Sequence, residues 1–482
     1  MKIKYIILGL CGLLSVISCD KELEINPEQS ITTEKAVSTP ENINNILIGA
    51  YANTGRSDLL GGNLQMYADL LGDSGYVSWF GTYPDLRTIY SKNIVSDNFY
   101  VRDTWRTAYK VIFETNLILE NLNIITTEND KKRTEGEAKF LRALNYFELV
   151  RYYGKTYING ANNTQPGVPL ILSGKINYNG NLSVARSTVE EIYTQVIKDL
   201  TDAITVLPVN NSYYADVYSA KALLTRVYLQ KGDYKKARDM AHDIITHSGK
   251  SLIPNYNDVF NTSQNTPEDL FAIQVTSQSG INDLITFYAS EANGGRGGDI
   301  ALKDEFLNLF EANDVRGSFY NLNPYDDKLT NKYTNRFGNL HVIRLAEIYL
   351  IRAESNFREN TSLGATPLED INTIRNRAKA SILSSVSLDD ILMERRKELA
   401  FEGFLLHDIK RTAGNVGSLP WSSDKLVFPI PLREMQVNPN WFKTLGITNI
   451  ELYTEKLKIL NFHFFQINIL WNHFLSILLH CF

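Results

Sequence analysis

Apolar residues recur at helical spacing through much of the 482-residue chain. Between Ala220 and Ile245 they follow a period of about 3.6 residues, stop at Gly232 and Asp233, and then resume. This pattern predicts two helices joined by a tight turn. One such hairpin leaves an apolar face uncovered, so we expect other helical hairpins to stack against it.

The same period predicts further helices on both sides of this hairpin, over residues 41–51, 105–122, 135–153, 187–206, 343–357, 367–380 and 388–401. The order of the small and aromatic residues in the hairpin is similar to that of a tetratricopeptide unit, whose antiparallel helices interlock. The residues that carry this similarity are Leu224, Tyr228, Gly232, Tyr234 and Ala237. We therefore predict a mainly α fold, a tetratricopeptide-like scaffold of helical hairpins with irregular loop-rich insertions and minor β structure.

Two segments lack the helical period. The first insertion, residues 59–100, is rich in Gly, Asp and aromatic residues. The second insertion, residues 251–325, combines a strand-like run at 270–275, a glycine cluster at 294–298 and one helix near 303–310. Stacked hairpins form a frame, and loops inserted into such a frame commonly carry the binding face. We expect the ligand to contact these two insertions.

The aromatic loop from Tyr76 to Tyr83 is the strongest ligand candidate in the first insertion. Rings flanked by Gly and Ser can stand out of a surface and stack on the apolar face of a sugar, while charged neighbours bond its hydroxyl groups. The same rings could instead anchor the loop against the scaffold. The candidates are Trp79, Phe80, Tyr83, Tyr76, Asp73 and Arg87, followed in the second insertion by Tyr288, Arg296 and Tyr320.

The first residues of the chain resemble a bacterial lipoprotein signal. Residues 1–18 hold two lysines and an apolar run too short for a permanent bilayer span, and Cys19 follows a small residue. The resemblance implies that Cys19 becomes the lipidated first residue and that residues 19–40 tether the protein to a membrane. An ordinary core helix or an uncleaved anchor is the alternative.

Cysteine content and charge narrow the possible functions. The chain has 3 Cys, which are Cys11 in the signal, Cys19 and Cys481, so the body can form neither a disulfide framework nor a cysteine metal site. The formal charge of -5 becomes -7 when Lys2 and Lys4 leave with the signal, which argues against a nucleic-acid partner.

No catalytic pattern emerges from the remaining charged and polar residues. The run from Glu394 to Glu398, like Arg344 and Glu347, is typical of a solvated helix face or of ion pairs with the next helix. Ser74 lies in a Gly-Asp-Ser-Gly sequence, but no histidine is placed to accept its proton. The glycine cluster lacks the Lys-Ser/Thr that binds phosphates. We predict no catalytic residues, no metal and no cofactor.

The tail, residues 442–482, carries no formal charge beyond Lys458, yet Asn, Gln and His interrupt its apolar run. As a membrane span it would be poor, because each polar group is costly in hydrocarbon. We interpret it as a stretch that did not evolve with the fold, for example translation past a damaged end of the reading frame. A peripheral apolar helix is the alternative.

Several ordered blocks together resemble the SusD/RagB family of outer-membrane nutrient-binding lipoproteins, and they span the chain from the signal to about Asn440. Besides the signal at Cys19 they are EAKFLRA at 137–143 with RYYG at 151–154, IRLAEIYLIRAE at 343–354, ERRKELAFEG at 394–403 and FPIP at 428–431. The family usually ends soon after the last block, and the present tail departs from it. The resemblance implies an N-terminal region at 41–265 and a C-terminal region at 266–441.

The resemblance implies a non-catalytic, lipid-anchored protein on the surface of the outer membrane. Such a protein captures an oligosaccharide or a peptide and covers a SusC-like TonB-dependent transporter, with the scaffold on the transporter and the insertions on the ligand. Two alternatives come from other classes. A tetratricopeptide protein could bind only other proteins, and a surface hydrolase is disfavoured by the missing nucleophile and base spacing.

Overall fold

The computed structural model describes residues 33–174, 183–278 and 280–438. The predicted signal, Cys19, most of the tether and the tail at 442–482 lie outside the described residues. Within those described, none of the helices combines the length and apolar character needed to cross a membrane.

The protein is mainly helical, as predicted. Its α-helices are α2 (Thr33–Ala36), α3 (Pro40–Thr54), α4 (Asn63–Gly72), α5 (Pro84–Tyr90), α6 (Phe99–Glu120), α7 (Glu128–Tyr153), α8 (Val189–Val206), α9 (Val217–Lys231), α10 (Tyr234–His247), α11 (Leu284–Tyr288), α12 (Asp304–Leu307), α13 (Leu345–Glu359), α14 (Pro367–Arg377), α15 (Leu388–Glu398), α16 (Leu405–Arg411) and α17 (Leu432–Val437). The strands are β1 (Val77–Trp79), β2 (Asp269–Ile273), β3 (Ile300–Leu302), β4 (Tyr320–Leu322), β5 (Lys328–Thr330), β6 (Leu340–Arg344), β7 (Asn415–Val416) and β8 (Leu419–Pro420).

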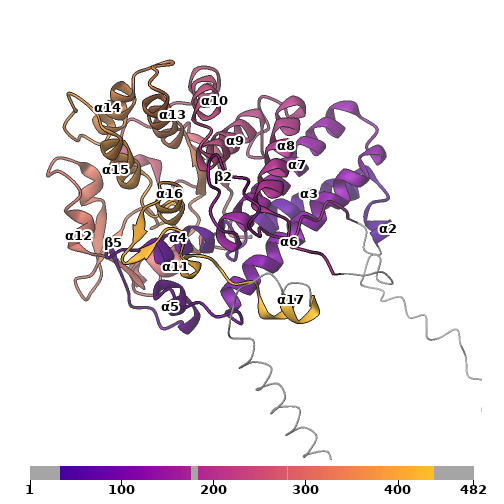
Figure 1. Cartoon of the computed structure of the whole chain (residues 1–482), viewed down its shortest axis with the longest axis horizontal. Coiled ribbons are helices and arrows are strands. Elements are labelled where there is room, and N and C mark those ends of the chain that lie inside the picture. Colours follow the sequence, from indigo (N-terminus) through magenta and orange to yellow (C-terminus); the bar gives the residue numbers. More distant parts are fainter. Residues whose placement is uncertain (1–32, 175–182, 279, 439–482) are drawn as a thin grey trace, which may run out of the picture.

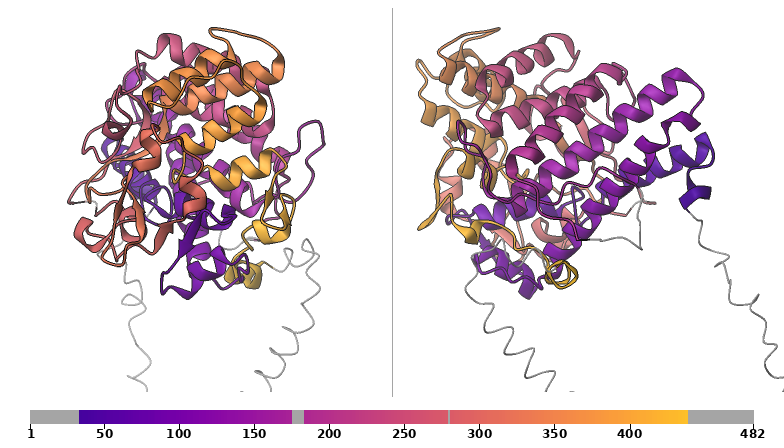
Figure 2. Two further views of the ribbon diagram at one scale, coloured as in Figure 1. Left: turned by 90° about the vertical axis from the view of Figure 1, so that its left-hand side faces the viewer. Right: turned by 45° about the vertical axis from the view of Figure 1, so that its right-hand side comes forward.

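The long helices form one continuous stack (Figure 1). In chain order α3 packs on α6, α6 on α7, α7 on α8, α8 on α9, α9 on α10 and α10 on α13, which then contacts α14 and α15. The rotated views show the same layered arrangement, with the shorter elements gathered on one side of it (Figure 2). The tetratricopeptide-like scaffold is therefore confirmed.

The hairpin of α9 and α10 matches the prediction closely. Gly232 ends α9 with φ of 78°, a left-handed conformation that costs little only for glycine. Asp233 then caps α10 by accepting a hydrogen bond from the Lys236 backbone N–H. Ala237 and Ala241 are fully buried, and their small side chains allow the neighbouring helices to approach closely.

The first insertion is more helical and more deeply buried than expected. Every residue of α4 is buried, including Asn63, Gln65 and Asp69. A helix that is covered on all sides shows no alternation of apolar and polar faces, so its sequence carries no helical period. The expectation of an irregular segment over 59–100 is wrong for α4 and α5.

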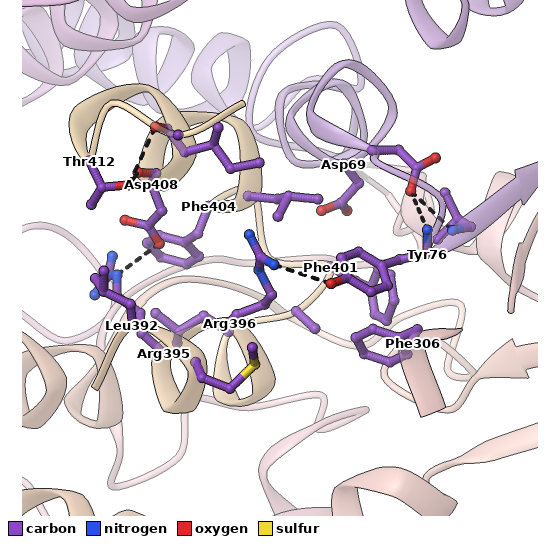
Figure 3. A pocket seen from close by; sticks show the side chains of 18 of the residues that line it. Asp69, Tyr76, Phe306, Leu392, Arg395, Arg396, Phe401, Phe404, Asp408 and Thr412 are labelled. Atoms are coloured by element: carbon purple, nitrogen blue, oxygen red, sulfur yellow. Dashed lines mark hydrogen bonds and ion pairs between the residues drawn. The ribbon is translucent and has the colours of Figure 1, made fainter. Parts of the chain in front are cut away.

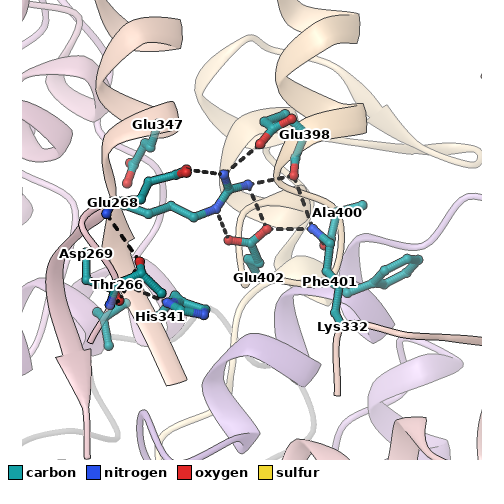
Figure 4. A network of polar contacts seen from close by, with 12 residues as sticks. Thr266, Glu268, Asp269, Lys332, His341, Glu347, Glu398, Ala400, Phe401 and Glu402 are labelled. Atoms are coloured by element: carbon teal, nitrogen blue, oxygen red, sulfur yellow. Dashed lines mark hydrogen bonds and ion pairs between the residues drawn. The ribbon is translucent and has the colours of Figure 1, made fainter. Parts of the chain in front are cut away.

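A buried ionic network joins the second insertion to the C-terminal helices (Figure 4). Its centre is Arg344, 2% exposed, which pairs with Glu268 at 3.0 Å, Glu398 at 2.6 Å and Glu402 at 2.7 Å. Lys332 extends the network, donating to Glu402 at 2.6 Å and to the Ala400 carbonyl at 2.8 Å. The sequence predicted either a solvated helix face or ion pairs between helices for these charged residues. The ion pairs are confirmed for Arg344 and Glu398, and the prediction of a solvated face is wrong for both, because they are buried.

The network lowers the pKa of two of its carboxyl groups, Glu402 and Glu398. Burial alone would raise the pKa of Glu402, but Arg344 and Lys332 outweigh it and hold that pKa below its usual value. The same competition, with Arg377 and Arg344 as the strongest opposing charges, lowers the pKa of Glu398. The second insertion is thus fixed to the scaffold by paired charges that water does not screen.

Candidate ligand-binding site

The two insertions meet in one four-stranded sheet whose strand order is β1-β3-β5-β4. β1 comes from the first insertion and pairs antiparallel with β3 from the second, with Val77 opposite Leu302 and Trp79 opposite Ile300. The Phe80 backbone N–H continues the ladder by donating to the Asp299 carbonyl at 2.8 Å. Loops more than 200 residues apart in the sequence therefore share one rigid support.

Two of the predicted ligand residues lie inside the protein. Trp79 is 6% exposed, and its ring lies 6.2 Å from that of Phe287. Tyr288 is 0% exposed and donates its hydroxyl to Asp69 at 2.5 Å. Trp79 does not stand out of the surface, and it takes the alternative role of anchoring the loop against the scaffold, while Tyr288 is part of the core.

Burial also changes the protonation of Asp69. Loss of hydration raises the pKa of this carboxyl to about 7, although the hydrogen bond from Tyr288 works in the opposite direction. Asp69 is therefore divided between its neutral and charged forms near neutral pH.

A different set of candidates remains at the surface, and we call it the aromatic shelf. It consists of Phe80, Thr82, Tyr83, Phe99 and Arg296. Phe80 is 56% exposed at the end of β1, where the alternation of an extended chain turns it away from buried Trp79. Phe99 is 39% exposed and stacks on Tyr100 at a centroid distance of 4.1 Å.

Arg296 joins the two insertions across the aromatic shelf. Its guanidinium carbon lies 4.3 Å from the centroid of the Tyr83 ring, and its Nη2 donates to the Thr82 hydroxyl at 3.1 Å. Asp299 lies 3.6 Å from the guanidinium Nε. These contacts fix a cation beside half-buried and exposed rings, an arrangement that can stack on a sugar and bond its hydroxyl groups.

Arg87, which is exposed, and Asp73, which is buried, both bond to the backbone of the loop. Arg87 donates to the Gly81 carbonyl at 2.8 Å. Asp73 accepts from the backbone N–H groups of Gly75 at 3.1 Å, Tyr76 at 2.8 Å and Val77 at 3.1 Å. Both side chains are engaged in holding the turn on either side of β1, so they shape the loop.

Tyr76 opens into a cavity of about 470 Å³ that we call the Tyr76 pocket (Figure 3). Its wall combines Tyr76 and Phe306 from the insertions with apolar residues of α15, α16 and the turn between them, including Leu392, Phe401 and Phe404. Arg396 Nη1 donates to the Tyr76 hydroxyl at 3.3 Å. Phe80 and Tyr76 lie at opposite ends of β1, about 13 Å apart at 3.3 Å per residue, so shelf and pocket flank one strand.

Tyr320 lies on the outer strand β4, where Lys328 Nζ is 5.9 Å from its ring centroid. β3 and β5 separate it from β1, so it is not brought onto the shelf. Two residues of these surfaces were not predicted from the sequence. Phe99 lies in the first insertion but outside the aromatic loop, and Arg396 lies on a helix expected to serve packing or ion pairing. Only the lack of a carboxylate within one helical turn of Arg396 on its exposed side could have singled it out, and that signal is weak.

The residues considered above for metal binding and catalysis have the following surroundings. Over 33–174, 183–278 and 280–438, no three His, Cys, Asp or Glu side chains gather as metal ligands would. The Ser74 hydroxyl accepts from the backbone N–H of Gly417 at 3.4 Å. His407 is 2% exposed, and burial lowers its pKa well below the usual range.

Family models match both halves of the chain. A model described as starch-binding and associating with the outer membrane matches residues 22–229, and a model of the SusD family matches residues 316–424. The chain belongs to the SusD/RagB family. The SusD-like protein P25 of Formosa agariphila is 26% identical over an alignment covering 91% of this chain and 98% of that protein.

Solved structures of SusD relatives share the fold. A SusD superfamily protein from Bacteroides thetaiotaomicron has a TM-score of 0.76 and 26% identity, covering 83% of this chain and 98% of its own. A putative sugar-binding protein from Bacteroides vulgatus has a TM-score of 0.74 and 26% identity, covering 84% of this chain and 97% of its own. A laminarin-binding SusD-like protein shares the fold with a TM-score of 0.70 at 23% identity, covering 83% and 98%. The family relationship supports carbohydrate binding and an association with the outer membrane.

Proposed function

We propose that this SusD/RagB protein captures an oligosaccharide on the aromatic shelf, without catalysis, and delivers it to a SusC-like TonB-dependent transporter in the outer membrane. The observation that carries the proposal is that Phe80, 56% exposed, is joined through its backbone bond to Asp299 to the segment that holds the Arg296–Tyr83 pair, on a sheet built from both insertions.

A sugar suits this surface better than a wholly apolar ligand would. A pyranose presents one apolar face and a rim of hydroxyl groups, so it needs a ring to stack on and fixed donors nearby. Phe80 and Phe99 offer the rings, whereas Arg296 and Thr82 offer the polar groups. A protein with the same fold is named for binding laminarin, a carbohydrate, which agrees with this choice.

Capture needs no chemical step from the protein. A protein that captures a ligand for later transport needs a binding surface that is already formed, because ordering loops on binding would weaken the affinity. The pairing of β1 with β3 meets that requirement. In this proposal a lipid on Cys19 holds the protein at the cell surface, and the helical scaffold faces the transporter.

Calorimetry with a laminarin tetrasaccharide, an oligosaccharide panel and a peptide panel tests the binding site. We expect Phe80→Ala to weaken oligosaccharide binding about tenfold, equivalent to about 1.4 kcal/mol, since a ring stack contributes about this much. Phe357→Ala on α13 is the matched control, because Phe357 is also partly exposed, at 37%, but lies on the scaffold. Equal affinities for both variants and the native protein would refute the shelf as the site.

Two further measurements test the rest of the proposal. Bound oligosaccharide recovered after long incubation should be unchanged in length, and shortened products would show hydrolysis. Cys19→Ser should release the protein from the outer-membrane fraction of cells that make it, and native protein should co-purify with a SusC-like transporter from the same cells. Capture of other proteins without any saccharide binding would favour the assembly function instead.

A further inference from the structure

A larger cavity, of about 760 Å³, lies apart from the aromatic shelf, between the loop after α5, the loop after α7 and the segment leading to α17. Four cationic side chains line it: Lys92, Lys155, Arg186 and Lys425. Asp424 is the one carboxylate among the lining residues, which leaves three excess positive charges there. This excess is notable in a chain whose formal charge is -5, and we call the site the basic cavity.

Arg186 is a cation held in place by three backbone carbonyls. Its Nε donates to the Gly167 carbonyl at 2.7 Å, and its Nη2 donates to the carbonyls of Tyr153 at 3.1 Å and Pro166 at 3.0 Å. No carboxylate of a described residue pairs with it, and Nη1 has no acceptor among those residues. Burial lowers the pKa of Arg186 to about 10, so it stays charged at neutral pH.

Two of the lysines, Lys92 and Lys425, form no ion pair with another described residue. Burial lowers the pKa of Lys92, although the nearby charge of Asp73 acts to raise it. Lys425 Nζ donates to the Asn93 side-chain oxygen at 3.3 Å, and Lys92 Nζ donates to the Leu70 carbonyl at 3.2 Å. Lys155 pairs with Asp424 at 2.9 Å, but their side chains are 52% and 85% exposed, so this pair contributes little and can open. Together the four cations surround a space that favours negative charge.

The basic cavity is too large for a single inorganic anion. A water molecule occupies about 30 Å³ in the liquid, whereas the cavity of about 760 Å³ is in the range of sites for small organic ligands. Asn93 and Gln165 add amide groups that can bond hydroxyls, and Pro166 and Pro429 add apolar surface. These features match a sugar ring that carries an acidic substituent.

We infer that the basic cavity is a second binding site, which takes the carboxylate or sulfate group of an acidic saccharide chain. The saccharide part of this inference rests on the proposed function, whereas the anionic part rests on the cavity alone. The guanidinium of Arg186 provides the fixed, planar donor suited to either oxyanion, and the lysines provide adaptable charge around it.

Calorimetry of the full chain with four probes tests this site: an oligogalacturonate tetrasaccharide, a sulfated carrageenan tetrasaccharide, the neutral laminarin tetrasaccharide and sodium sulfate. We expect at least one acidic tetrasaccharide to bind more tightly than sulfate ion, and its affinity to fall as ionic strength rises. Whether the carboxylate or the sulfate probe binds identifies the acidic group. Lys425→Glu and Arg186→Gln should each weaken that binding about tenfold or more, because hydrogen bonds to charged groups are strong.

Lys235→Glu on α10 is the matched control, since it makes the same change in net charge at an exposed position of the scaffold. Lys425 is also exposed, so its variant does not depend on a core contact for folding. Laminarin binding should be equal in Lys425→Glu and native protein. The laminarin titration separates the two sites, because failure of laminarin to bind would count against the aromatic shelf alone.

Three outcomes would overturn the inference. Neither acidic tetrasaccharide would bind, or Lys425→Glu and Arg186→Gln would bind the acidic probe as tightly as Lys235→Glu, or sodium sulfate would bind as tightly as the tetrasaccharides. The last result would reduce the basic cavity to a site for free anions.

Discussion

Replacing Arg344 by methionine removes the central charge of the buried network and leaves a shorter, unbranched apolar side chain. Arg344 makes five hydrogen bonds, to Glu268, to two atoms of Glu398 and to both carboxylate oxygens of Glu402. Removing one partner of a buried ion pair typically destabilises a protein by about 3–5 kcal/mol, because the remaining charges stay buried without compensation. We expect Arg344→Met to fall in this range.

The corresponding shift in melting temperature follows from the size of the protein. An unfolding entropy of about 2.1 cal/mol/K per residue gives about 0.8 kcal/mol/K for about 400 folded residues. A loss of about 4 kcal/mol then lowers the melting temperature by about 5 °C. Differential scanning calorimetry at pH 7 measures this shift, with Arg106→Met as the control, since the Arg106 side chain is 66% exposed and pairs with Asp103 at the surface.

The pH dependence provides a sharper test. In the native protein the folded pKa of Glu402 lies below its usual value, so its contribution to stability is present at neutral pH and declines as pH falls through that folded pKa. Without Arg344, we expect burial to dominate and to raise the pKa of Glu402. Protonation of Glu402 then removes an uncompensated buried charge as pH falls from 7 to 5, so the variant loses less stability at pH 5. We expect the difference in melting temperature to shrink at pH 5. A shift no larger than that of Arg106→Met at pH 7 would refute the reasoning.

Two further stability predictions concern single positions. Gly232→Ala should destabilise the protein by about 1–2 kcal/mol in urea unfolding, because Gly232 adopts φ of 78°. Gly49→Ala inside α3 should not destabilise it, since the new methyl group meets no atom within 4 Å. Equal effects of the two substitutions would contradict this explanation. Asp69 has a pKa raised to about 7, so native stability should fall as pH rises from 5 to 8, and Asp69→Asn should abolish that fall. A pH profile unchanged in the variant would show that another group titrates.

The scaffold could be predicted from the sequence because its helices are amphipathic. Residues such as Val196 and Leu200 in α8 recur on one buried face, and Thr188 and Glu191 form the capping box that begins the helix. Tertiary burial erased this signal in α4, where Asn63 and Gln65 are as buried as their apolar neighbours. The start of α7 was missed for the opposite reason, since its first turns are polar and exposed.

The candidate site was predictable as a region but not as a set of contacts. Composition placed the rings in the insertions, and no local pattern distinguishes exposed Phe80 from buried Trp79 one position earlier. That difference depends on which face of β1 meets the core, which only the pairing with β3 decides. The cations of the basic cavity were invisible for a similar reason, because Lys92, Arg186 and Lys425 come from three distant segments.

The pairing of β1 with β3 has a consequence for any attempt to transplant ligand preference between relatives. A chimera that exchanges only one insertion would place a foreign strand against a native one, and the shelf residues on each would no longer face their partners. Arg296 would lose Tyr83 and Thr82, which come from the other insertion. The two segments therefore form a single exchangeable unit, and a recipient must take both or neither.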